Sequence, residues 1–407
     1  MDIALPSPLL GGLSSAAFMR RHWQKKPLLV RAALPDAPNI VDRGALFELA
    51  AHDDVESRLV ERHVERNSQR IVGPTSGRDV DHAAERWSLR HGPFTRRSLP
   101  GLKGRAWTLL VQGADLHLEA AHRLLRRFAF VPAARLDDVM LSFATDGGGV
   151  GPHIDSYDVF LLQVRGRRRW KIGKVKAPVL RQDAPLKLLA DFAPSAEWLL
   201  EPGDMLYLPP GWAHDGVAEG ETITASIGFR AAGVESLGAG VVQHLLDAFE
   251  APDAEALYSD PRQEATAEPA RIPVALQRCA EASVKRLLDD RIALGRALGE
   301  ALSEPKPRVW FEPGSAPAEP TAVRLDRRTR MLYDDRHVFI NGDACRAAGR
   351  DAKLVRRLAD RGVLDRAEIA ALSVEARALV DEWIESGWLV AAPDRIPEPL
   401  PDQEDSA

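Results

Sequence analysis

The residues best suited to chemistry are a histidine and an aspartate that stand two positions apart in GGGVGPHIDSYDVFLLQVRGRRRWKIG, residues 147–173. Residues i and i+2 of a β-strand point to the same face, so the imidazole of His153 and the carboxylate of Asp155 can converge on one point. The glycines and Pro152 before them let the backbone come close to a bound group. This pattern predicts two ligands of one metal ion.

A third ligand is expected in EPGDMLYLPPGWAHDGVAEG, residues 201–220, where His214 follows a strand-like run and a Pro-Pro-Gly-Trp turn. It stands 59 residues beyond Asp155 (214 − 155). Two histidines and one carboxylate leave coordination positions open, which favours iron(II) and oxygen chemistry. A closed zinc site would need a fourth protein ligand, usually sulfur, and no cysteine is near in sequence.

An anion-binding residue is predicted in RGRRRWKIG, residues 165–173, where the side chains alternate along a strand. One face carries only cations, and the other is mostly apolar and carries Arg168 inward beside Trp170. A buried guanidinium needs an anion, and its planar fork suits a carboxylate. Beside an iron that activates oxygen, the expected ligand of this arginine is the distal carboxylate of 2-oxoglutarate. The alternative is that Arg168 pairs with an internal Asp or Glu.

Weaker candidates lie on neighbouring runs. Ser142 falls on the opposite face from Leu141 and Phe143, so its hydroxyl could reach the same carboxylate. Thr224 and Ser226 are candidates of the same kind. Two residues that follow the metal pair could touch substrate, although a buried tyrosine beside a core is ordinary: Tyr157 and Asp158. The remaining histidines have no comparable context and receive no role: His22, His52, His63, His82, His91, His117, His122, His244 and His337.

The elements that must position these residues lie between about residues 14 and 230. Five short β-rich runs alternate with Gly, Pro and Asp clusters, as expected for an antiparallel β-domain with helical decoration in an α+β chain. The runs are DDVMLSFA, YDVFLLQV, RRRWKIG, GDMLYLPP and TITASIGFR. We therefore expect a first domain over residues 1–232.

The sequence pattern after residue 232 differs from that of the first domain. Residues 233–303 show apolar side chains at three-and-four spacing, which indicates helices. A proline-rich crossing, 303–323, leads to strand-like and helical segments, so residues 304–394 suggest a winged-helix-like module. Such a module could bind a partner or nucleic acid, or could serve only for packing. The acidic tail, 395–407, is expected to be disordered.

Composition narrows the classes of function. The chain has 407 residues, 54 basic and 59 acidic side chains, and a net charge of −5. This balance argues against direct binding to nucleic acid, because phosphate contacts need a positive surface. Only two distant cysteines, Cys279 and Cys345, are present, which favours a reducing cytoplasm. We expect no signal peptide and no membrane span, because no leader and no long apolar run is seen.

Two segments carry a family resemblance. HIDSYDVFLLQVRGRRRWKIG and GDMLYLPPGWAHDG resemble the JmjC branch of the cupin (jelly-roll) fold, the 2-oxoglutarate- and iron(II)-dependent oxygenases. FMRRHWQKKPLLVRAALP is similar to the opening segment of these proteins. Within the branch, the likeness is to bacterial ribosomal oxygenases, which hydroxylate an arginine of a large-subunit ribosomal protein. This likeness is strong over residues 14–230. Beyond them it depends only on the order in which a helical region and a winged-helix-like region follow each other.

The resemblance implies a double-stranded β-helix core, a helical region that dimerises, and a C-terminal winged helix. It makes His153, Asp155 and His214 the iron ligands, and Arg168 and Ser142 the 2-oxoglutarate contacts. The implied reaction couples decarboxylation of 2-oxoglutarate to hydroxylation of the protein substrate, by a homodimer. Three alternatives remain open: a JmjC demethylase, a non-catalytic cupin that binds a metal, and a winged-helix regulator whose cupin half senses a small molecule.

Overall fold

The computed structural model describes residues 2–67, 82–103, 106–249, 257–319 and 321–392. The chain divides into two units, Met1–Ala231 and Ala232–Ala407. The predicted tail, 395–407, lies outside the described residues. Within the described part of the chain, every helix is too short or too polar to cross a membrane.

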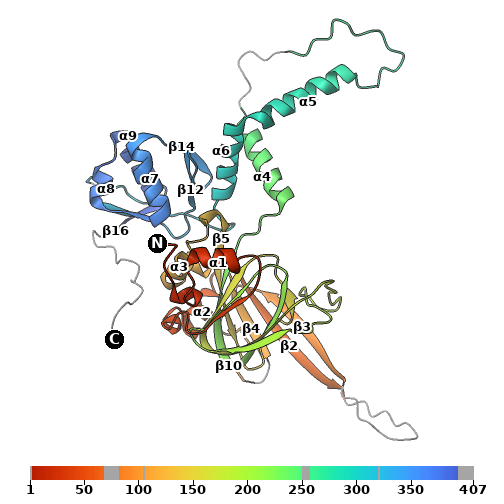
Figure 1. Cartoon of the computed structure of the whole chain (residues 1–407), viewed down its shortest axis with the longest axis vertical. Coiled ribbons are helices and arrows are strands. Elements are labelled where there is room, and N and C mark those ends of the chain that lie inside the picture. Colours follow the sequence, from red (N-terminus) through yellow and green to blue (C-terminus); the bar gives the residue numbers. More distant parts are fainter. Residues whose placement is uncertain (1, 68–81, 104–105, 250–256, 320, 393–407) are drawn as a thin grey trace. The chain divides into compact units, whose positions relative to one another are not determined.

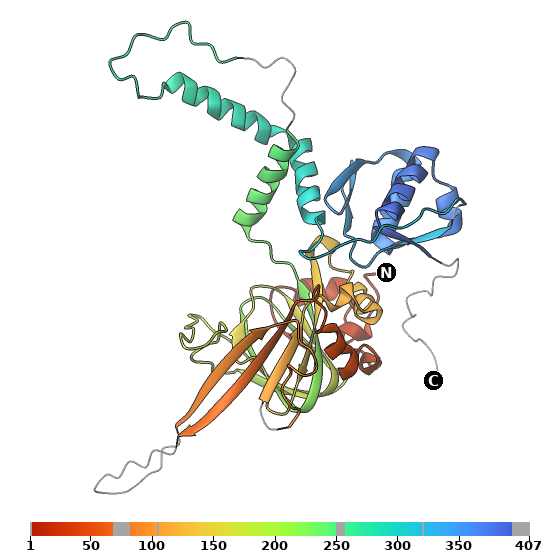
Figure 2. The ribbon, with the colours of Figure 1, turned by 180° about the vertical axis from the view of Figure 1, so that it is seen from behind.

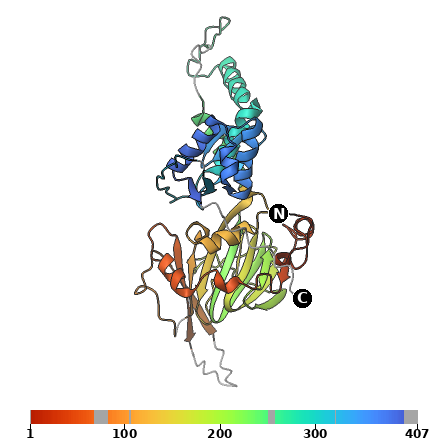
Figure 3. The same cartoon turned by 90° about the vertical axis from the view of Figure 1, so that its left-hand side faces the viewer.

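The first unit is built on a sheet whose strand pairs are antiparallel, in the order β1-β9-β7-β10-β5-β4-β2-β3, with β6 added to β10 and β8 to β7. The sheet curls into a barrel with short helices on its outside (Figures 1 and 3). This arrangement confirms the predicted double-stranded β-helix. The strands are β1 (Leu28–Val30), β2 (Ser57–Asn67), β3 (His82–His91), β4 (Ala106–Val111), β5 (Leu136–Ala144), β6 (His153–Ile154), β7 (Val159–Lys174), β8 (Ala196–Leu200), β9 (Met205–Leu208) and β10 (Trp212–Phe229), and the helices are α1 (Ser15–Arg21), α2 (Arg43–Leu49) and α3 (Glu119–Arg126).

The two faces of the strands carry separate apolar cores. On one face, Phe143 and Phe160 join a large cluster with Phe18 of α1 and Leu124 of α3. On the opposite face, the strands enclose smaller clusters around Trp170 and around residues of β2 to β4. Because successive side chains of a strand alternate, the face away from the helices is the interior of the barrel. Residues able to do chemistry project into that interior.

Two predicted runs turn out to be one strand. YDVFLLQV and RRRWKIG both belong to β7. Its pairing with β10 is irregular at two points: Gln163 pairs with Thr224 but Arg165 with Ile223, so Val164 is an extra residue of β7, a bulge, whereas near Gly166 the extra residues belong to β10. Gly166 has a φ of 64°, and a Cβ there would collide with the carbonyl oxygen of Glu221. Before the bulge Leu161 faces the interior, and after it Trp170 does, so the inward positions change from odd to even numbers.

Several strands of the first unit were missing from the sequence prediction, among them β2 and β3. β2 and β3 form a long hairpin that projects from the barrel (Figure 2). Their sequences, SRLVERHVERN and HAAERWSLRH, contain many charged residues, so apolar patterning did not reveal them. The hairpin supplies Arg62, Glu85 and Trp87 to a pocket described below.

The second unit begins with three helices. The run 275–298, which reads as one helix, contains a break: Asp290 has a ψ of 93° and caps the next helix by accepting from Ile292 N and Ala293 N. Against the following sheet, α6 packs so closely that a Cβ on Gly299 would meet the ring of Phe339. The helices are α4 (Val234–Asp247), α5 (Val274–Asp289) and α6 (Arg291–Ser303).

The rest of the second unit is a winged helix, as predicted. Two three-stranded sheets flank a helical group whose core includes Leu358, Val380 and Trp383. A short helix, α8, was absent from the prediction; it begins with a capping box at Asp365. The elements are β11 (Ala322–Leu325), β12 (Met331–Tyr333), β13 (His337–Ile340), β14 (Asp343–Arg346), α7 (Gly349–Arg361), β15 (Val363–Leu364), α8 (Arg366–Ala370), α9 (Val374–Glu385) and β16 (Leu389–Ala392).

Candidate metal centre

The three predicted ligands meet at one point of the first unit. His153 on β6 pairs with His214 on β10, and Asp155 follows two residues after His153. One ligand atom from each of the three side chains lies within 4.8 Å of the other two. Asp155 Oδ1 is 3.9 Å from His153 Nε2, and Asp155 Oδ2 is 3.6 Å from His214 Nε2. These separations are too long for hydrogen bonds and leave room for an ion between the three groups.

Both imidazoles are prepared to bind a cation through Nε2. The Nδ1 atom of His153 lies 2.9 Å from the carbonyl oxygen of Gly151, and that of His214 lies 3.2 Å from the carbonyl oxygen of Trp212. Donation from Nδ1 to a carbonyl leaves the Nε2 lone pair free and fixes the ring. Burial also lowers the pKa of His214 well below its usual value, so this ring is neutral, as a metal ligand must be.

The donor set selects the kind of metal. Across residues 2–67, 82–103, 106–249, 257–319 and 321–392, no fourth His, Cys, Asp or Glu joins the group. Two imidazoles and one carboxylate with open positions suit non-haem iron(II), whereas a structural zinc site is closed by four protein ligands. Burial raises the pKa of Asp155, and a bound cation would reverse that effect by stabilising the carboxylate. The residues therefore fit iron(II).

The run of glycines before His153, residues 147–151, is here called the glycine loop. It lies along β10: Gly147 N donates to Ala218 O at 3.0 Å, and Ala218 N donates to Gly148 O at 2.9 Å. A Cβ on Gly148 would stand 2.6 Å from the carbonyl oxygen of Trp107, which no side chain tolerates. Glycine is required here because the loop is pressed between neighbouring backbones.

Arg168 faces the interior of the barrel, as the alternation of side chains along the strand predicts. It is 4% exposed, whereas the Arg167 side chain on the opposite face is 54% exposed. Its Nη1 donates to Ser142 Oγ and Thr224 Oγ1, both at 3.2 Å, and its guanidinium lies 5.3 Å from the ring of Trp170. Burial lowers its pKa to about 10.

The guanidinium of Arg168 is incompletely satisfied. Its Nε is buried and has no hydrogen-bond partner. Among the described residues, no Asp or Glu forms an ion pair with Arg168, so the alternative of an internal carboxylate partner is not what the structure contains. A buried cation held only by two hydroxyls is costly unless an anion binds beside it. Arg168 therefore fits the carboxylate of a bound ligand.

The structure places the weaker candidate residues in two different environments. Ser142 and Thr224 lie directly opposite each other on β5 and β10, and both contact Arg168. Asp158 is fully buried and accepts from Tyr207 Oη at 2.6 Å and from Gln24 Nε2 at 3.0 Å, so its carboxylate is part of the core.

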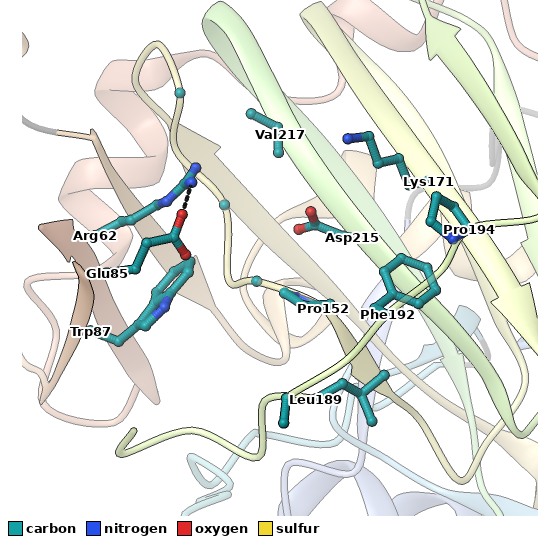
Figure 4. Close-up of a pocket in the computed structure, with 14 residues that line it drawn as sticks. Arg62, Glu85, Trp87, Pro152, Lys171, Leu189, Phe192, Pro194, Asp215 and Val217 are labelled. Atoms are coloured by element: carbon teal, nitrogen blue, oxygen red, sulfur yellow. Dashed lines mark hydrogen bonds and ion pairs between the residues drawn. The ribbon is translucent and has the colours of Figure 1, made fainter. Parts of the chain in front are cut away.

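The structure adds a residue that the sequence argument passed over. Asp215 follows His214, and the alternation of β10 turns its carboxylate to the other face of the strand. There it lines a pocket with Arg62, Glu85 and Lys171 (Figure 4). The alternation that placed Arg168 could have identified Asp215 as well, but the hairpin residues that complete the pocket come from strands that were not predicted.

Two families of domain match this chain. A JmjC domain matches residues 123–237, and a ROXA-like winged helix matches residues 286–390. The ribosomal protein uL16 3-hydroxylase of Escherichia coli is 32% identical over 314 residues, which are 75% of this chain and 76% of the relative. A probable ribosomal oxygenase of Haemophilus influenzae is 32% identical over 244 residues, which are 59% of this chain and 54% of the relative.

The fold agrees with solved structures. An X-ray structure of E. coli YcfD superimposes with a TM-score of 0.77 at 27% identity, covering 93% of this chain and 98% of the other. A second structure, of the same ribosomal oxygenase in complex with cobalt and 2-oxoglutarate, has a TM-score of 0.74 at 28% identity over the same fractions. The domains, the sequence identity and the fold agree, and this chain belongs to the JmjC-domain ribosomal oxygenases.

Proposed function

We propose that this chain hydroxylates an arginine side chain of the large-subunit ribosomal protein uL16, with iron(II) as metal and 2-oxoglutarate as cosubstrate. The E. coli relative is named for 3-hydroxylation of uL16, and a structure of the E. coli ribosomal oxygenase YcfD contains cobalt and 2-oxoglutarate. The observation that supports this most strongly is the His-Asp-His group in the same barrel as Arg168, a buried cation without an acidic partner among the described residues. Such a substrate would place the protein in the cytoplasm.

Each residue has a distinct task in this proposal. His153, Asp155 and His214 hold iron(II), and Arg168 with Ser142 holds the distal carboxylate of 2-oxoglutarate. Iron(II), 2-oxoglutarate and dioxygen supply the oxidising chemistry that places a hydroxyl on an unactivated carbon. The chain supplies orientation: backbone carbonyls fix both imidazole rings. It also supplies a dry anion site, because the guanidinium is buried.

The test is a hydroxylation assay. Purified protein is incubated with iron(II), ascorbate, 2-oxoglutarate and peptides that tile uL16, and the peptides are weighed by mass spectrometry. The expected result is a gain of one oxygen on an arginine, absent with His153→Ala or without 2-oxoglutarate. Loss of a methyl group from a methylated peptide would instead identify a demethylase. Retained metal with neither peptide modification nor succinate formation would favour a non-catalytic cupin.

We also propose that the helical region, residues 233–303, joins two copies of the chain. α5 has no buried residue, and it exposes an apolar stripe at helical spacing: Leu276, Val284, Leu287 and Leu288. A stripe of this kind on a helix normally packs against a partner. Val284→Glu with Leu287→Glu is expected to convert a dimer into a monomer in light scattering, and Arg278→Glu is the control. A monomeric wild type would refute the proposal.

For the winged-helix module, residues 304–394, we propose a role other than binding nucleic acid. The second helix of a helix-turn-helix enters the groove of DNA. The corresponding helix here, α9, carries four acidic residues and one arginine, which would repel phosphates: Glu375, Asp381, Glu382, Glu385 and Arg377. Salt-dependent binding of a defined duplex by the full chain would contradict this.

A further inference from the structure

A second pocket lies beside the metal centre and contains none of its predicted ligands. Its volume is about 300 Å³, and its walls come from the glycine loop, β10, the β2–β3 hairpin and residues 189–194. Figure 4 shows Asp215 in the middle of these walls, with Arg62 and Glu85 on one side and Lys171 on the other.

The pocket and the metal centre share their structural supports. Asp215 is the residue after His214 on β10, and Pro152 is the residue before His153. Because neighbouring residues of a strand point to opposite faces, the imidazole of His214 and the carboxylate of Asp215 emerge on opposite sides of β10. The strand therefore separates the two sites, and a substrate chain that passes its edge reaches from one to the other with several extended residues, each spanning about 3.3–3.6 Å.

The pocket is lined by two cations, Arg62 and Lys171, and two anions, Glu85 and Asp215, but only Arg62 and Glu85 form an ion pair. Arg62 forms an ion pair with Glu85, and its guanidinium also lies 5.9 Å from the ring of Trp87. Asp215 stands opposite Lys171 in the strand register, but no ion pair joins these two described residues. Within the described ranges, Asp215 forms neither a hydrogen bond nor an ion pair, although the charges of Arg62 and Lys171 act on it at longer range. A partly buried anion in this position is stabilised by a cationic ligand.

The remaining walls suit the stem of a long side chain. Leu189, Phe192 and Pro194 form an apolar side with Pro152 next to them, and Val217 lies on the far side of Asp215 (Figure 4). Lysine and arginine bury their methylene stems on apolar surface while the charged end meets a carboxylate. Aromatic walls such as Phe192 also attract a cation placed over the ring.

We propose that this pocket binds the cationic side chain of a lysine or arginine that flanks the target residue in the protein substrate. In this proposal Asp215 pairs with the positive charge of that side chain, and Leu189, Phe192 and Pro194 pack against its methylene groups. The inference rests on the proposed function, because it assumes a basic protein substrate whose target residue reaches the metal.

The test begins with binding, so that it does not depend on turnover. Peptides that tile uL16 are titrated into the full-length protein loaded with zinc and N-oxalylglycine, an unreactive analogue of 2-oxoglutarate. Asp215→Asn is expected to raise the peptide Kd about tenfold, as for the loss of one charged hydrogen bond. The matched control is Glu219→Gln, on the same face of β10 but outside the pocket. Affinity for N-oxalylglycine should be equal in all three proteins, which shows that the metal centre is intact.

A peptide series then identifies the partner. Each basic residue near the target is replaced by norleucine, which keeps the stem and removes the charge. One replacement should weaken binding to the wild type about tenfold and leave binding to Asp215→Asn unchanged. In turnover, Asp215→Asn should raise KM for the peptide with little change in kcat.

The outcomes separate the two proposals. If Asp215→Asn binds every peptide as the wild type does, or if every replacement weakens both proteins equally, the pocket assignment is overturned while hydroxylation stands. If binding depends on Asp215 but no peptide gains oxygen, the pocket is supported and the proposed function fails. If the wild type binds no peptide, both fail. A fall in kcat alone would show that Asp215 acts through His214, which also overturns the assignment.

Discussion

Replacing Arg168 by methionine is the most informative single change. Methionine fills a similar volume without charge, so it removes the proposed anion site without opening a large cavity. A carboxylate held by the guanidinium fork accepts two charged hydrogen bonds, each contributing about 1.5–3 kcal/mol. Their sum, about 3–6 kcal/mol, corresponds to a rise of about 10²- to 10⁴-fold in the 2-oxoglutarate concentration required.

The same change should have the opposite effect on stability. Arg168 is a buried cation whose Nε has no partner, so its charge destabilises the ligand-free protein. Arg168→Met should therefore keep or raise Tm without 2-oxoglutarate, while the rise in Tm that 2-oxoglutarate gives the wild type disappears. Affinity for cobalt(II) should be unchanged, because Arg168 is no metal ligand.

Succinate formation measured against 2-oxoglutarate concentration, with thermal unfolding of the same samples, checks both effects. Arg167→Met is the control, since this neighbouring side chain faces outward and is 54% exposed. A lowered Tm with an unchanged 2-oxoglutarate requirement would show that Arg168 is structural. Equal effects of the two substitutions would refute the assignment of faces.

Asp155→Ala should abolish cobalt(II) binding, measured by absorption spectroscopy, because only two ligands remain; retained binding would mean that another group holds the metal. Gly216→Ala should lower the stability by about 1–3 kcal/mol in denaturant unfolding, because its Cβ would stand 2.6 Å from the ring of Trp170; an unchanged midpoint would contradict this packing. Asp326 gives a pH prediction: burial acts to raise its pKa, but hydrogen bonds from Arg328 outweigh this and hold the pKa below its usual value. Since the unfolded state then binds more protons, this contribution is present above the ordinary aspartate pKa and is lost as the pH falls through the lowered value. Asp326→Asn should flatten the acid limb of the stability curve, and an unaltered limb would exclude this ion pair as its source.

Spacing predicted His153 and Asp155, and the strand and turn before His214 predicted the third ligand; the structure brings the three together because β6 and β10 pair in register. Alternation also placed Arg168 correctly, since a single strand decides which way its side chains face. His214 follows β9 and a turn, as the sequence predicted, and the structure adds that it already lies within β10, which begins at Trp212. The turn and the strand start overlap there, so local patterning could not separate them.

What the sequence did not reveal depends on contacts between distant segments. The β2–β3 hairpin has charged side chains on much of its length, and only its pairing with β4 makes it part of the barrel. The break at Asp290 was hidden because the apolar spacing of α5 continues into α6. Asp158 was considered near substrate from its position after the ligands, yet Tyr207 and Gln24, remote in sequence, draw it into the core.

The bulge at Val164 lets both halves of β7 present side chains to the same barrel interior. Gln163 pairs with Thr224 and Arg165 with Ile223, so β7 has one extra residue here and its inward positions change from odd to even. Deleting this extra residue would restore simple alternation along β7 and would leave Arg168 facing inward. A homologue that lacks one residue between Gln163 and Arg168 should therefore lack the bulge and keep an arginine at the position aligned with Arg168. Alignments of this family can be checked for that arginine, and a gap without it would mark a protein that has lost the anion site.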